Sequence, residues 1–178
     1  MKRVRVGAIG ARPTNFNTVR YSEKLLENLG ITVETLDLSE VFFRVANLSD
    51  NDIRVGEKLV LLKANGDTSA IPQDKLHKMA KLFVVISEWI IANDIDTTAM
   101  QCWTSLQQNL GINVCSIMSV MSGQLMPSAC EVDVMGALSM YALASCSLAP
   151  ASIADWNNNF GAERDKCVLF HCGNFASE

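Results

Sequence analysis

The sequence lacks the basic excess that a nucleic-acid-binding protein needs. Its 178 residues contain 15 Lys and Arg against 19 Asp and Glu, which gives a net charge of -4 and a pI near 5.2. Nucleic acids and anionic membrane surfaces attract basic patches, so we expect neither as a partner. The composition favours a small molecule or another protein.

Long hydrophobic runs and paired cysteines are also missing. The most apolar stretch, residues 82–92, contains Ser87 and Glu88 and is too short for a bilayer, which predicts a buried helix. The N-terminus leads directly into a strand pattern and does not resemble a signal peptide. Six cysteines form no C-x-x-C pair, so we expect free, mostly buried thiols and a cytoplasmic protein.

Most of the common catalytic motifs are absent. There is no H-E-x-x-H, no G-x-S-x-G and no P-loop, and His77 and His171 are the only histidines. The segment GAIGAR lacks the third glycine of the dinucleotide fingerprint, which favours a tight turn at Gly10. Arg12 in the same loop is available for an oxygen-rich ligand group.

What the sequence does contain is a repeated alternation of strand and helix patterns. Strand patterns lie at residues 3–10, 31–39, 96–103, 112–117, 151–158 and 167–174. Helical patterns lie at residues 18–30, 40–48, 73–95, 104–111 and 128–144, with Ser39 as an expected cap. This order predicts a single α/β domain over residues 1–178: a doubly wound, Rossmann-like, mostly parallel sheet with helices on both faces. The polar segment 49–71 is expected to be a flexible connection within it.

In such sheets ligands bind beyond the carboxyl ends of the strands, so polar residues there are the candidates. Glu131 precedes a helix so apolar that it must be buried, and a buried carboxylate needs compensation. Asp155 and His171 each end an apolar strand pattern. Taken singly, Asp155 is also typical of a turn and His171 of a hydrogen-bonded core histidine.

Together, two carboxylates and a histidine would form an oxygen-rich site that selects Mn²⁺, Mg²⁺ or Co²⁺ over thiolate-binding metals. On this interpretation the neighbouring Cys130 and Cys172 are structural bystanders. Asp133 is expected to cap the following helix or to orient Glu131.

With these residues in view, the sequence resembles the L-fucose isomerase and L-arabinose isomerase superfamily, most closely its fucose isomerase-like branch. The segments that carry the resemblance are QCWTSLQ, PSACEVDVMGALSMYAL, ADWNNN and LFHCGN, in the second half of the chain.

The resemblance implies a sugar isomerase that interconverts an aldose and a ketose through a cis-enediol at a divalent metal, usually Mn²⁺. It implies that Glu131 and Asp155 are metal ligands that also act as acid/base groups, and that His171 is a further ligand, as in the arabinose branch. Gln101 is implied as a sugar contact, and we group Trp103, Asn157 and Arg12 with it as substrate-binding residues.

Proteins of this superfamily are much longer, so we expect this chain to be the central part of a longer, homo-oligomeric enzyme, and to be inactive alone. The alternative from another class is a non-catalytic sugar-binding or regulatory α/β module that uses the same loops. A metal requirement for sugar binding would favour the isomerase.

Overall fold

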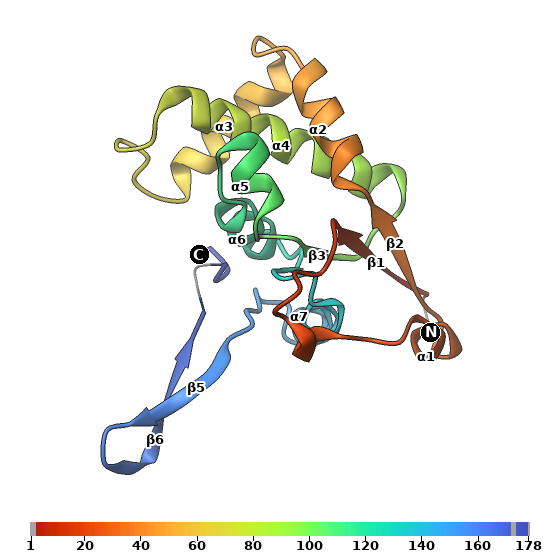
Figure 1. Ribbon diagram of the computed structural model, residues 1–178, viewed down its shortest axis with the longest axis vertical. Coiled ribbons are helices and arrows are strands. Elements are labelled where there is room, and N and C mark those ends of the chain that lie inside the picture. Colours follow the sequence, from red (N-terminus) through yellow and green to blue (C-terminus); the bar gives the residue numbers. More distant parts are fainter. Residues whose placement is uncertain (1–2, 172–173, 178) are drawn as a thin grey trace.

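The structure, a computed structural model, describes residues 3–171 and 174–177 (Figure 1). Its centre is a four-stranded parallel sheet with the strand order β2-β1-β3-β4. The strands are β1 (Val4–Ile9), β2 (Ile31–Leu36), β3 (Thr97–Met100) and β4 (Ser128–Ala129). The predicted α/β class with a mostly parallel sheet is therefore confirmed.

Helices cover both faces of this sheet. The α-helices are α1 (Glu23–Asn28), α2 (Leu38–Asn47), α3 (Ile53–Ala64), α4 (Gln73–Ala92), α5 (Ser105–Leu110), α6 (Cys115–Gly123) and α7 (Val134–Ser147), with a 3-10 turn η1 at Asn17–Val19. Figure 1 shows α2 to α6 gathered on one side and α1 with α7 on the other.

Alternation along the strands explains the two layers. Val6 and Ala8 pack into the smaller apolar cluster with α1 and α7, whereas Ile9 and Met100 join the larger cluster beneath α2, α4 and α6. A side chain at Gly7 would meet Trp89 of α4, so glycine here allows the helix to lie close to the strand.

The long apolar stretch forms a buried helix, as predicted. Its segment from Leu82 to Ile86 is buried without interruption within α4. Among the described residues, no helix is long and apolar enough to cross a membrane.

Two predicted boundaries move because of local capping. Asp37, not Ser39, caps α2, since its carboxylate accepts a hydrogen bond from the Ser39 backbone N–H at 2.7 Å. The helix predicted from Ser128 begins instead at Val134, because Ser128 pairs with Thr98 as part of β4. The segment 49–71 contains α3, capped by Asp52 and packed against α4.

The strand predicted to begin at Ile112 is wrong. The chain enters α6 at Cys115, and the Asn113 side chain accepts a hydrogen bond from the Val114 N–H at 2.9 Å. Seven residues of α6 are buried, on several faces of the helix, so the sequence shows a short apolar run without a clear helical period.

The last two predicted strands exist but do not join the parallel sheet. β5 (Asp155–Phe160) and β6 (Glu163–Phe170) form an antiparallel pair that projects from the body (Figure 1). Nearly every residue in the pair is exposed. The two-residue connection Gly161–Ala162, with Gly161 at φ +59°, allows a hairpin, whereas a parallel pair needs a long crossover.

Candidate functional site

The candidate site lies where β1, β3 and β4 end. Gln101 joins the first two of these ends: its Oε1 accepts a hydrogen bond from the Ala11 N–H at 2.9 Å, and its Nε2 donates to the Trp103 carbonyl at 2.8 Å. Gly10 adopts φ +83°, and a Cβ there would lie 2.5 Å from the Gln101 Oε1. This glycine is therefore required for the close approach of the two loops.

Glu131 is held in an unusual backbone conformation. Glu131 and Val132 both have positive φ, at +62° and +55°, which is rare for non-glycine residues and most of all for a β-branched one. Hydrogen bonds on either side fix the turn, from the Val132 N–H to the Met100 carbonyl and from the Asp133 N–H to the Cys130 carbonyl. The strain is concentrated at the residue that sequence analysis selected.

The environment of Glu131 favours its protonated form. Burial raises the pKa of Glu131 to about 7, and the nearby charges of Cys102 and Asp155 add to the effect. A carboxyl group with a pKa near neutrality can both accept and return a proton near pH 7. Perturbed groups of this kind are frequent at functional sites.

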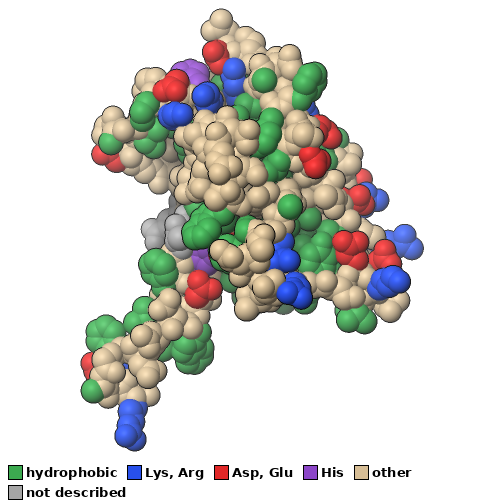
Figure 2. All heavy atoms as spheres, viewed as in Figure 1, with side chains coloured by type: hydrophobic (Ala, Val, Ile, Leu, Met, Phe, Trp, Pro, Cys, Tyr) green, Lys and Arg blue, Asp and Glu red, His purple; other side chains and the backbone are tan. Residues whose placement is uncertain are grey.

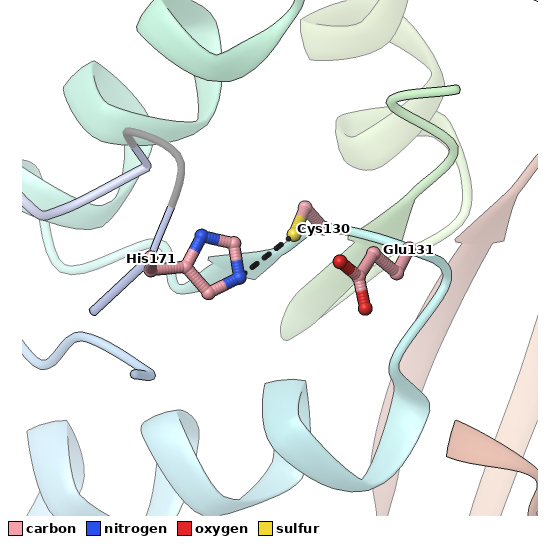
Figure 3. Close-up of side chains that lie close together, drawn as sticks. All are labelled: Cys130, Glu131 and His171. Atoms are coloured by element: carbon pink, nitrogen blue, oxygen red, sulfur yellow. Dashed lines mark hydrogen bonds between the residues drawn. The ribbon is translucent and has the colours of Figure 1, made fainter. Parts of the chain in front are cut away.

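His171 lies opposite Glu131. Its Nε2 is 3.1 Å from the Cys130 Sγ, and the Glu131 carboxylate points towards the same space (Figure 3). The ring is buried, with 9% of the residue exposed, and its Nδ1 has no hydrogen-bond partner among the described residues. The Nε2, on the side of Cys130 and Glu131, is therefore the ring nitrogen that could ligate a cation at this site.

Three residues bring ligand atoms within 4.8 Å of one another: Cys130, Glu131 and His171. Carboxylate and imidazole donors suit divalent cations such as Mn²⁺, whereas the thiol of Cys130 would favour a softer metal if it bound directly. Cys130 was expected to be a bystander, yet it contacts His171. Cys172 lies outside the described residues.

Asp155 reaches the site by a different route from the one predicted. It does not end a parallel strand but begins β5, where it pairs with Phe170, the residue before His171. The hairpin thus brings Asp155 and His171 to its base. Asp155 lies outside the group of three, although its charge contributes to the raised pKa values of Glu131 and Asp133.

Asp133 has the capping role that the sequence indicated. Its side chain accepts a hydrogen bond from the Gly136 N–H at 2.8 Å and so begins α7. Burial raises its pKa. The turn that carries Glu131 is therefore anchored to the helix that follows it.

Sequence reasoning missed the two thiols at this edge. The Cys102 thiol is hydrogen-bonded with Cys130 and to backbone groups of Glu131 and Trp103, and these bonds lower the pKa of Cys102 to about 7. The available signal was position, since Cys102 follows β3 and Cys130 follows β4. No disulfide joins any two of the five cysteines among the described residues, as expected, and Cys146 and Cys167 are exposed.

Three of the four predicted substrate contacts line one cavity. Arg12, Gln101 and Trp103 border a cavity of about 380 Å³ beside the loop that follows β1. Phe16 meets Trp103 edge to face, with ring centroids 5.5 Å apart. Asn157 does not border this cavity: it lies on exposed β5, at a register shift in the hairpin.

Comparison with known proteins relates this chain to sugar isomerases. No family model matches the chain. It is similar to sulfoquinovose isomerases, with 28% identity to that of Alkalicoccus urumqiensis and 27% to that of Priestia megaterium. These alignments cover 97% of this chain, which spans about two fifths (39%) of each relative's length. The similarity supports a relation to sugar isomerases broadly.

Proposed function

We propose that this chain contributes the metal-binding and proton-transfer part of an aldose–ketose isomerase site. The observation that carries the proposal is the convergence of Glu131 and His171, from separate elements, at the carboxyl edge of the sheet. The similarity to sulfoquinovose isomerases over nearly the whole chain supports the same reaction class. The likeness of the QCW and CEVD segments to the fucose isomerase-like branch points the same way.

The residues present fit a divalent cation. Glu131 supplies a carboxylate, the buried His171 ring supplies the Nε2 nitrogen on the same side, and Asp155 adds negative charge from the base of the hairpin. We propose Mn²⁺, with Mg²⁺ or Co²⁺ as substitutes, because carboxylate and imidazole ligands suit these ions. Such a cation would supply Lewis-acid polarisation of the sugar oxygens, which would acidify the proton on C2.

Glu131 is the proposed acid/base group. As a carboxylate it accepts the C2 proton of the open-chain sugar, and as the resulting acid it returns that proton to C1. The hydroxyl proton of O2 passes to O1 in the same interconversion, and the two transfers together convert the aldose into the ketose. Its pKa of about 7 populates both forms near neutral pH. Asp155 is the second carboxylate at the site, and its exposed position suits a proton relay to solvent.

The proposed substrate is an open-chain sugar in the cavity between the β1 and β3 loops. The cavity volume of about 380 Å³ lies within the range of small-molecule sites. Sulfoquinovose, the sugar in the relatives' names, is the first substrate to test.

The decisive experiment is an aldose-to-ketose assay with Mn²⁺ on the native-length protein, comparing wild type with Glu131→Gln. The substitution keeps the shape of the side chain but removes its charge and its proton acceptor, so we expect turnover to fall by about a thousandfold or more. Glu27→Gln, the same substitution on the exposed surface of α1, is the matched control and should retain full activity. Near-normal turnover in Glu131→Gln would refute the assignment, and metal-independent sugar binding without turnover would support the non-catalytic module.

A further inference from the structure

Two arginines in the loop after β1 have no acidic partner within the part of the chain that the structure describes. The Arg12 Nη1 donates to the carbonyls of Pro13 at 3.0 Å and Phe16 at 3.1 Å, and both Arg12 and Arg20 reach the Asn17 Oδ1, at 3.4 and 2.8 Å. Among the described residues, no carboxylate forms an ion pair with either guanidinium. Two positive charges are thus held together around one neutral amide.

These charges border the cavities next to the candidate site. Arg12 lines the cavity with Gln101 and Trp103, and it lines a second one of about 320 Å³ that extends to Val132, the neighbour of Glu131. Arg12 and Arg20 together line a third, of about 480 Å³. Arg12 therefore borders both the cavity that reaches Val132 and the cavity that Arg20 lines, with Asp37 at the first and Glu23 at the second.

The guanidinium groups retain donors for a ligand. The three hydrogen bonds of Arg12 all come from its Nη1, so the N–H groups on the other nitrogens of the guanidinium remain available to a ligand. Arg20 uses one nitrogen for Asn17. Paired guanidinium groups recognise sulfonate, phosphate and carboxylate oxygens through charge-assisted hydrogen bonds.

We propose that Arg12 and Arg20 form an anion subsite that binds an acidic group on the end of the sugar remote from C1 and C2. The subsite makes the enzyme selective for anionic sugars over their neutral counterparts. This inference rests on the proposed isomerase function. A sulfonate is one such group, and a phosphate or carboxylate shares its chemistry.

The test compares sulfoquinovose with quinovose, the same sugar without the sulfonate, in the native-length protein with Mn²⁺. Arg12→Gln and Arg20→Gln are compared with Lys63→Gln, which removes one charge from the exposed end of α3. We expect each arginine variant to raise KM for sulfoquinovose about tenfold or more, and to raise KM for quinovose several times less. Glucose 6-phosphate and glucuronate, assayed as inhibitors, distinguish sulfonate from the other anions.

Equal losses with both sugars in both arginine variants would show that the arginines only organise the loop, and would overturn the inference. So would unchanged KM values, or an equal loss in Lys63→Gln. If Glu131→Gln abolishes turnover while the arginine variants keep the wild-type preference for sulfoquinovose over quinovose, the isomerase function is supported and the anion subsite is refuted. If calorimetry shows Arg12-dependent binding of sulfoquinovose but wild type forms no ketose, the anion subsite is supported and the isomerase function is refuted.

Discussion

The α/β body and the β5–β6 hairpin differ in what holds them together. In the body, β1 and β3 lie between two helical layers, and side chains such as Phe83 are fully buried. In the hairpin, Trp156 is 79% exposed and Leu169 61% exposed, and Figure 2 shows hydrophobic side chains along its length. An isolated two-stranded hairpin is at best marginally stable in water. The body therefore carries its own stability, whereas the hairpin depends on its attachment.

The candidate site straddles this boundary. Glu131 belongs to the body, while Asp155 and His171 lie together at the base of the hairpin, where β5 begins and β6 ends. Residues 174–177 then return the chain to the body, where the Ser177 N–H bonds the Ser119 carbonyl at 3.1 Å and the buried Asn174 lies beside β4. The geometry of the site thus depends on how the body holds the base of the hairpin.

The largest expected contrast is in side-chain truncation. Phe83→Ala should destabilise the chain by about 3–5 kcal/mol, because it leaves a cavity in the larger apolar cluster. Trp156→Ala removes a larger ring but should change the free energy of unfolding by less than about 1 kcal/mol, since that ring is solvated. Urea denaturation measures both, and comparable losses would show that the hairpin is packed against something.

A second contrast uses two glycines with positive φ. Gly10→Ala should cost about 2–4 kcal/mol, because it combines left-handed strain with a clash against Gln101. Gly161→Ala, at the hairpin turn, meets no atom within 4 Å and should cost about 1 kcal/mol from backbone strain alone. Thermal unfolding measures both variants, and a larger loss of stability in Gly161→Ala than in Gly10→Ala would contradict this expectation.

A third contrast concerns side chains that bond the backbone. Asp133→Ala should cost about 1 kcal/mol, because the α7 N-terminus loses its cap. Asn158→Ala in the hairpin, where the side chain accepts from the Asn159 N–H in solvent, should cost less than about 0.5 kcal/mol. Asp133→Asn serves as the control and should restore most of the loss. Urea denaturation checks the order, and no rescue by Asn would contradict a capping role.

The smallest expected effect is a pH dependence of the metal-free chain. The folded pKa of Glu131, about 7, is above its ordinary value of 4.5, so between these values the folded state binds more protons than the unfolded state. The contribution of Glu131 to stability should therefore be fully present below about pH 4.5 and be lost as pH rises towards 7. The loss should be about 1 kcal/mol or less, because the group is partly exposed. Urea midpoints measured across this range should lose that slope in Glu131→Gln, and an unchanged slope would remove Glu131 as its source.

Much of the fold could be predicted from the sequence, because several helices and strands show a clear periodicity of hydrophobic residues. The helix at Gln73–Ala92 and the strands β1 and β2 follow from their hydrophobic patterns alone. α6 could not be recognised, because a helix buried on several faces shows no amphipathic period. The hairpin was misassigned to the sheet because the apolar residues of 167–170 resemble a buried strand, although they are exposed or only partly buried.

The candidate site could be predicted in part, for reasons that differ between residues. Glu131 stands out in sequence as an acid before a very apolar helix, but the positive φ at Glu131 and Val132 has no sequence signature, since neither is glycine. The contact between Cys130 and His171 joins residues 41 positions apart and depends on the hairpin's return path. The charge pair Arg12 and Arg20 also appears only once the loop is folded around Asn17.

The metal site formed by Glu131 and His171 is tested most directly by a Mn²⁺ titration of this chain. Electron paramagnetic resonance of the free ion monitors the titration. We expect weak but measurable binding by wild type, and a Kd raised by about tenfold or more in both Glu131→Gln and His171→Ala, because each removes a ligand. His77→Ala, on the α4 surface, is the control and should bind as wild type does. Unchanged affinity in both Glu131→Gln and His171→Ala would contradict a metal site shared between the body and the base of the hairpin.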